Sequence, residues 1–260
     1  MPEKDKVLLK TFGIGYDEQR NRVVVAFLRY LSNLSREHQQ IWQAQEISGE
    51  CKVNGDYLRA SFLGAWPEYY SVYEAFIQEQ VEINKLSSMI GKPALFKATF
   101  EEGKRPLEFS PMLRPTLQNF QNFAHTLDKM LSENMNREFF RGDISLEDRI
   151  EANDGTVEKR QLGTITLLER WLSAKYRRAD GQDASREVVA PFREVRKMRQ
   201  PAAHAMGKDE YNQSFANKQD GLLGRVKMAL TTLRLIFMSH PKARGYSAPE
   251  WLDGDKIVFF

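Results

Sequence analysis

The sequence predicts a mainly α-helical protein: an antiparallel helical bundle in the C-terminal half, preceded by an N-terminal α+β portion that contains a small hairpin. Three observations lead to this prediction. Apolar residues recur at helical spacing through most of the second half. A polar, glycine-containing stretch at 141–156 separates two of these segments and predicts a loop. Alternation of apolar and polar residues, which is typical of a strand, is confined to short segments near residue 100.

The second half predicts four amphipathic helices, over residues 115–131, 157–177, 185–200 and 210–238. In the last of them, steps of three and four residues place a continuous apolar stripe on one face: Leu222, Val226, Leu230, Leu233 and Phe237. Pro201 ends the third helix, because proline lacks an N–H and biases the preceding residue away from helical angles. Four such helices joined by modest loops are most simply an antiparallel bundle.

The first half is more mixed. A helix is predicted over about 20–42, although the run Val23-Val24-Val25 leaves a strand open there. A second helix is predicted from Pro67, which suits a first helical turn, to about residue 88.

A hairpin and a tail complete the predicted architecture. Apolar and polar residues alternate at 96–100 and again at 107–109, and Pro106 confines the second of these strands to an edge. We therefore divide the chain into an N-terminal recognition or regulatory region over 1–112, a helical bundle over 113–242, and a C-terminal tail over 243–260 in which a short strand is expected.

Composition excludes several classes of protein. Because 42% of the residues are hydrophobic and 28% are charged, the chain is expected to fold around a core. A single cysteine, Cys51, excludes an internal disulfide framework and a cysteine-based zinc site. Four scattered histidines offer no convincing metal set, so neither a metal nor a cofactor is expected. The lack of a secretory signal pattern and of any long apolar stretch predicts a cytoplasmic protein without a membrane span.

Positive charge is concentrated late in the chain. Residues 157–208 include twelve basic and six acidic residues, an excess of six, whereas the whole chain carries a formal net charge of +3. Such an excess suits an RNA-binding surface, and a solvated helical face accounts for it equally well. The candidates for phosphate or RNA contact are Arg193, Arg196, Lys197 and Gln200.

Arg199 and His204 form the strongest candidate catalytic site. The inward stripe of their helix includes Val195, and one further turn reaches Arg199, which is therefore expected to lean toward the bundle. Pro201 then redirects the chain and brings His204 within reach. An imidazole can take the proton of a 2′-hydroxyl or protonate the leaving oxygen, and a guanidinium can hold the phosphate bidentately. Because one histidine cannot serve as base and acid in the same step, a symmetric dimer is expected to supply a second pair.

The spacing Arg199-x4-His204, late in a predicted helical bundle, resembles the Arg-x4–6-His motif of HEPN domains over roughly residues 115–240. The resemblance implies a metal-independent endoribonuclease completed by dimerisation, of the kind common among bacterial toxins and abortive-infection effectors against phage. It makes Arg199 the phosphate-binding residue and His204 the general acid/base. Gln200 is longer than the short polar residue that often follows the arginine in that family, and Pro201 inside the motif constrains the geometry between Arg199 and His204.

Two alternatives stay open. Arg234-x5-His240 matches the same spacing, but Arg234 precedes Leu235 in a strongly apolar helix and predicts a core position, with His240 at the helix end. The other alternative makes Arg199 a salt-bridged arginine and His204 a capping histidine. The protein would then be a non-catalytic helical module that binds nucleic acid or a larger defence or toxin–antitoxin partner.

Overall fold

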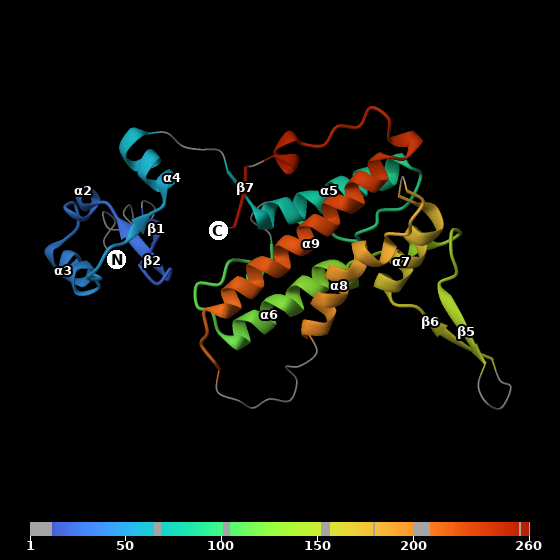
Figure 1. The fold of residues 1–260 in the computed structure, drawn as a ribbon, viewed down its shortest axis with the longest axis horizontal. Coiled ribbons are helices and arrows are strands. Elements are labelled where there is room, and N and C mark those ends of the chain that lie inside the picture. Colours follow the sequence, from blue (N-terminus) through green and yellow to red (C-terminus); the bar gives the residue numbers. More distant parts are fainter. Residues whose placement is uncertain are drawn as a thin grey trace. The chain divides into compact units, whose positions relative to one another are not determined.

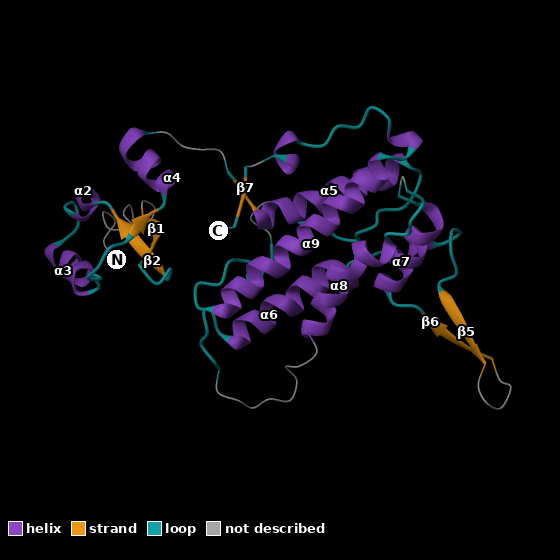
Figure 2. Cartoon of the chain, viewed as in Figure 1, coloured by secondary structure: helices purple, strands orange, loops and turns teal. Residues whose placement is uncertain are grey.

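The computed structural model describes residues 12–64, 69–100, 105–151, 157–178, 180–199, 209–254 and 256–259. This part of the chain is mainly helical with a few small sheets, so the predicted fold class is confirmed at that level (Figure 2). The chain divides into two compact units, Met1–Glu68 and Tyr69–Phe260.

The first unit is a small antiparallel sheet with short helices. Its elements are β1 (Phe12–Tyr16), β2 (Arg22–Ala26), α2 (Leu28–Leu31), α3 (Arg36–Ala44), β3 (Lys52–Val53), α4 (Gly55–Leu58) and the π-helical turn η1 (Arg59–Leu63), with strand order β2-β1-β3. Gly13 allows a close approach between β1 and Tyr57, because a Cβ at this position would collide with the tyrosine ring.

The helix predicted over 20–42 is only partly present. Val23, Val24 and Val25 lie in β2, so the strand alternative is confirmed. β-branched side chains favour this outcome, because they pack well on a pleated surface. A separate helix, α3, begins after Ser35, whose hydroxyl accepts a hydrogen bond from the His38 N–H.

The second unit is a helical bundle (Figure 1). Its helices are α5 (Val72–Met89), α6 (Leu117–Asp128), α7 (Thr164–Lys175), α8 (Ser185–Arg199) and α9 (Ser214–Met238), with the shorter turns η2 (Lys129–Glu133), η3 (Arg137–Phe140), η5 (Pro241–Ala243) and η6 (Glu250–Asp253). Its strands are β4 (Tyr70–Ser71), β5 (Glu147–Glu151), β6 (Val157–Gln161) and β7 (Ile257–Val258).

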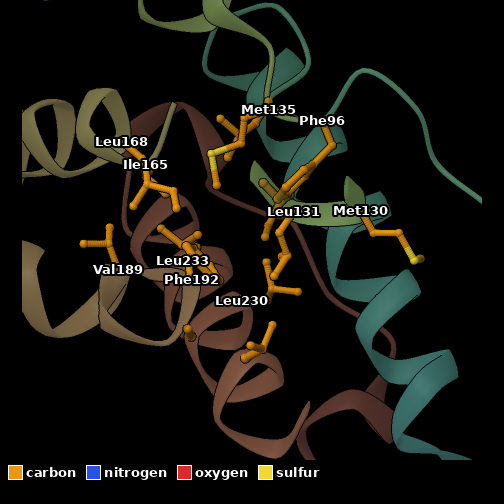
Figure 3. Packing of buried hydrophobic residues seen from close by; sticks show 14 of the residues in the cluster. Phe96, Met130, Leu131, Met135, Ile165, Leu168, Val189, Phe192, Leu230 and Leu233 are labelled. Atoms are coloured by element: carbon orange, nitrogen blue, oxygen red, sulfur yellow. The ribbon is translucent and has the colours of Figure 1, made fainter. Parts of the chain in front are cut away.

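The core of the second unit contains the stripe that the sequence predicted on α9. Leu222, Val226, Leu230, Leu233 and Phe237 are all 0% exposed. Figure 3 shows Leu230 and Leu233 near Phe192 of α8, and Leu131 of η2 belongs to the same buried cluster. The periodicity of α9 therefore identified its buried face correctly.

α5 belongs to the bundle and not to the N-terminal region. A capping box starts it: the Ser71 hydroxyl accepts from the Glu74 N–H at 3.2 Å, and the Glu74 carboxylate accepts from the Ser71 N–H at 2.9 Å. The apolar face of α5 is buried against α9 and joins the same core. The two compact units therefore divide at 68/69, whereas the sequence placed the domain boundary at 112/113.

The bundle is not simply antiparallel, which corrects the predicted arrangement. The Leu117 N–H donates to the Glu210 carbonyl at 2.9 Å, so α6 starts beside the chain that leads into α9. Farther along, both helices reach the same part of α5, through hydrogen bonds from Gln80 Nε2 to the Met130 carbonyl at 2.8 Å and from Thr231 Oγ1 to Glu79 at 2.7 Å. α6 and α9 therefore run in one direction. α5 shares it, because Glu79 lies beside Thr231 while Gly91, just after α5, lies beside Lys242, just after α9.

α8 runs antiparallel to α7, as the sequence predicted. Its first turn pairs with the chain just after α7, through Arg178 and Glu187 at 3.2 Å, and Arg193 farther along α8 pairs with Glu169 earlier in α7. The turn between these two helices is short, which forces a reversal of direction. The connection 90–116 is longer and leaves room for the chain to return before α6 begins. α8 and α9 are again antiparallel, since Glu194 late in α8 pairs with Arg225 early in α9. Phe192 accordingly lies near Leu230 and Leu233 farther along α9 (Figure 3).

The hairpin predicted from residues 96–100 and 107–109 is wrong for the residues described. Phe96 instead forms an isolated antiparallel bridge with Met135, and the Phe109 N–H donates to the Pro106 carbonyl in a turn. Phe96 and Phe109 are both buried in the bundle core, which explains their apolar character without a strand.

The real hairpin lies where a loop and the first turns of a helix were predicted. β5 and β6 pair in register, with Asp148 opposite Arg160 and Arg149 opposite Lys159. Both strands are rich in charged residues and lack apolar alternation, so no hydrophobic pattern announces them. Arg170 of α7 fastens β5 by donating two hydrogen bonds to Asp148, at 2.6 and 2.8 Å.

The C-terminal tail returns to the start of the bundle. β7 pairs in parallel with β4, and the Trp251 ring stacks on Tyr70 with centroids 4.1 Å apart. The short strand expected in the tail is therefore present.

Candidate functional site

Arg199 is the last residue of α8 and leans inward, as the helical spacing from Val195 predicted. Its Nη1 lies 2.8 Å from Asp128 Oδ2 and 2.5 Å from Glu133 Oε1. These hydrogen bonds, the one to Asp128 first, raise the pKa of Arg199 above its ordinary value. The guanidinium is therefore permanently charged and held by two carboxylates.

A π-helical turn places the two carboxylates. α6 ends at Asp128 and continues as η2, which carries Glu133 at its end. π-helical turns inside α-helices occur frequently at functional sites. A residue of α7 stabilises this π-helical turn: Thr164 Oγ1 donates to the Ser132 carbonyl at 2.6 Å. The Ser132 hydroxyl in turn donates to the Asp128 carboxylate.

Asp128 and Glu133 hold Arg199 in different environments. The Asp128 side chain is 1% exposed, whereas those of Glu133 and Arg199 are 43% and 33% exposed. The buried ion pair fixes the guanidinium, and the other side of the group faces solvent. In the described part of the chain both hydrogen bonds come from Nη1, which leaves the Nε and Nη2 donors of Arg199 without a protein acceptor there. Two donors on one edge of a guanidinium match the geometry of a phosphate.

A cavity of about 450 Å³ adjoins Glu133. Phe100, Pro106 and Thr126 contribute to its wall, together with the exposed Lys129. Glu108 and Glu133 also line it, so its wall is partly apolar and carries two carboxylates and one ammonium group.

The remaining predicted site residues fall in two groups. His204 and Gln200 lie outside the described residues, so their distance from Arg199 is not defined. Arg196 and Lys197 are exposed in the last turn of α8, and Arg193 is exposed but pairs with Glu169.

The structure offsets much of the basic character of residues 157–208. Three of its basic residues pair with carboxylates from earlier parts of the chain: Lys175 with Asp143, Arg170 with Asp148, and Arg199 with Asp128. Acidic residues within the segment do the same, since Glu169 contacts both Arg186 and Arg193. A count of charges over residues 157–208 missed this compensation because Asp128, Asp143 and Asp148 lie earlier in the chain.

The second motif match, Arg234 and His240, is resolved in favour of a core role. Arg234 is 0% exposed and lies 2.7 Å from Glu79, and it also pairs with Asp253. His240 caps η5 by accepting a hydrogen bond from the Lys242 N–H at 3.2 Å. Each residue therefore has its own structural partners, as the apolar surroundings predicted.

Sequence reasoning missed the acidic partners. Asp128 continues the i, i+4 series of Phe120 and Ala124 on the buried stripe of α6, and an acid at such a position is a signal for a buried cation. Glu79 is a comparable acid on the buried stripe of α5. Nothing along the sequence indicated which arginine each acid would meet.

Among the residues described, no three His, Cys, Asp or Glu side chains gather as potential metal ligands. No described helix combines the length and the apolar character that a membrane crossing requires. No family model, curated protein or solved structure matches this chain.

Proposed function

We propose that this protein is a metal-independent endoribonuclease of HEPN type, cytoplasmic and active as a homodimer in antiphage defence or as a toxin. The observation that carries the proposal is the partly exposed guanidinium of Arg199, which the buried Asp128 fixes while one edge of donors remains open. A guanidinium that is already fixed and permanently charged suits phosphate binding, because its side chain loses little conformational entropy when the substrate binds.

His204 has the role of general acid/base in this proposal. One imidazole takes the proton from the 2′-hydroxyl, whose oxygen attacks the phosphorus, and the imidazole of the second protomer protonates the departing 5′-oxygen. Arg199 holds the phosphate and offsets the charge that develops on it. Arg196 and Lys197, exposed in the same helical turn, attract the flanking phosphates.

A second candidate function has its own observation. The two carboxylates on Arg199 compete with a phosphate, and such a pair is also what a purely structural arginine makes. The alternative is therefore a non-catalytic helical module that binds nucleic acid or a protein partner.

RNA cleavage in EDTA separates the two functions. We expect purified wild-type protein to cleave a labelled single-stranded RNA and to leave the same sequence in 2′-deoxy form intact. His204→Ala should lower the rate at least about 100-fold, which is the usual scale of general acid–base catalysis. His240→Ala is the matched control, because it removes the histidine of the other motif match, and it should leave the rate unchanged.

Arg199→Lys tests the phosphate-binding role without removing the ion pair. Lysine keeps a positive charge beside Asp128 and loses the bidentate fork, so cleavage should fall sharply while the melting temperature changes little. Absence of cleavage by the wild type, or equal cleavage by wild type and His204→Ala, would favour the non-catalytic module.

A further inference from the structure

An apolar groove of about 550 Å³ lies between α8 and α9 in the second unit, away from Arg199. α9 lines it with residues spaced along a single face from Arg225 to Ser239, which spans roughly 21 Å at the α-helical rise per residue. α8 lines the opposite wall with its first two turns, including Val188 and Pro191. The space is therefore long and narrow.

The walls of the groove are predominantly apolar and partly open to solvent. Leu172, Val188, Ala229 and Ile236 contribute aliphatic surface, and Met228 is 62% exposed at the rim. Contact between such an apolar surface and water is unfavourable in free energy, so a ligand that covers the surface is stabilised there. Pro191 also cannot donate to the Glu187 carbonyl, so one backbone acceptor on this wall lacks its helical partner.

Charge is distributed unevenly at the two ends. At one end Arg225 is neutralised by two hydrogen bonds to Glu194, at 3.0 and 2.7 Å. At the other end, where α7 finishes, Arg178 pairs with Glu187. Arg177 beside it lies near enough to Asp183 to help lower the pKa of that carboxylate, but the two form no direct salt bridge, and Arg177 Nη1 donates to the carbonyls of Ser173 and Tyr176.

The size of the groove favours a small ligand. The observed volume falls within the range of about 300–1,000 Å³ that is typical of small-molecule sites.

We propose that this groove binds a free amphipathic carboxylate of fatty-acid type. Its narrow apolar chain lies along α9 past Met228, and its carboxylate meets Arg177. This inference is independent of RNA cleavage, because it uses none of the residues assigned to that reaction.

Calorimetric titration of the full-length protein with decanoate, and in parallel with the uncharged decanol, tests the proposal. We expect saturable binding of one decanoate per chain and weaker binding of decanol. Arg177→Ala should weaken decanoate about fivefold, the upper range for a solvent-exposed ion pair, and leave decanol unchanged. Met228→Glu should weaken both ligands, decanoate by at least about tenfold, since a charge replaces apolar surface in the groove.

Leu235→Glu is the matched control, because Leu235 is 51% exposed on the same helix but does not line the groove. This variant should bind decanoate like the wild type, and melting curves on all three variants establish that each is folded. Non-saturating uptake, or equal weakening by Leu235→Glu and Met228→Glu, would overturn the proposal. So would a loss of decanol affinity in Arg177→Ala equal to the loss of decanoate affinity.

Discussion

Two arginines of the bundle differ in how deeply their side chains are buried. Arg199 and Arg234 are both held by carboxylates, but their side chains are 33% and 0% exposed. A fully enclosed guanidinium has no route to a substrate, whereas a partly exposed one can meet a phosphate at its free edge. Burial, which the motif spacing does not encode, therefore separates the two matches.

The Glu79–Arg234 pair yields a prediction for stability. Arg234→Leu should lower the free energy of unfolding by about 3 kcal/mol, because it leaves the buried Glu79 charge without its main partner. Lys227, whose Nζ is 4.0 Å from Glu79, limits the loss. Glu79→Leu combined with Arg234→Leu should recover part of it, since the buried carboxylate is gone and the remaining Lys227 ammonium still donates to the Leu252 carbonyl at 3.2 Å.

Urea denaturation of the wild type, both single variants and the double variant gives the coupling energy directly. If the double variant is less stable than Arg234→Leu, the charge of Glu79 does not account for the cost. Asp253, whose side chain is 52% exposed, stays solvated in every variant.

At the scale of elements, the turn between α7 and α8 depends on one carboxylate. Asp183 accepts hydrogen bonds from Ser173 Oγ at 2.6 Å and from the Ser185 N–H at 2.8 Å. These bonds, that from Ser173 first, lower the pKa of Asp183 from 3.8 to about 2. The carboxylate thus joins the end of α7 to the start of α8, and it does so more strongly when it is ionised.

Because the folded-state pKa is lowered, Asp183 stabilises the fold above pH 4, and this stabilisation is lost as the pH falls from about 4 to about 2. Asp183→Asn should therefore be less stable than the wild type near neutral pH, with the difference shrinking toward pH 2. Urea midpoints measured across this range check the prediction. Ser173→Ala should reduce the same pH dependence in part, and a difference that stays constant from pH 6 to pH 2 would exclude the proposed link.

At the scale of the whole molecule, the chain divides into two compact units, and the second has its own core. The capping box of α5, the buried cluster and the β4–β7 pair all lie within Tyr69–Phe260. We expect a fragment of residues 69–260 to unfold cooperatively, with a midpoint close to that of the full chain.

A fragment of residues 113–260 is the matched control, because it begins at the boundary that the sequence suggested and lacks α5. It should fail to fold cooperatively, since Arg234 and the apolar face of α9 lose their main cover. Calorimetry on the two fragments decides the boundary, and a folded 113–260 fragment would restore the earlier division.

The candidate site was accessible to sequence reasoning only in part. Helical spacing placed Arg199 on the inward side of α8, and the structure has it there. The same spacing offered no means of choosing Asp128, 71 positions away, as its partner. Predicting such a pair needs the path of the chain between the two helices.

Local patterns determined which segments are helical and which face of each is apolar, because a period of 3.6 residues is a property of neighbouring positions. They also determined the strand in the tail and the core position of Arg234. Tertiary structure alone decided the common direction of α5, α6 and α9, the charged hairpin of β5 and β6, and the pairing of acids with arginines. The helix directions and the acid–arginine pairs depend on contacts between residues far apart in the chain, whose free energies are set by burial and by the partners available. The hairpin is local, but its charged strands carry no apolar pattern, and Arg170 of α7 holds it by pairing with Asp148.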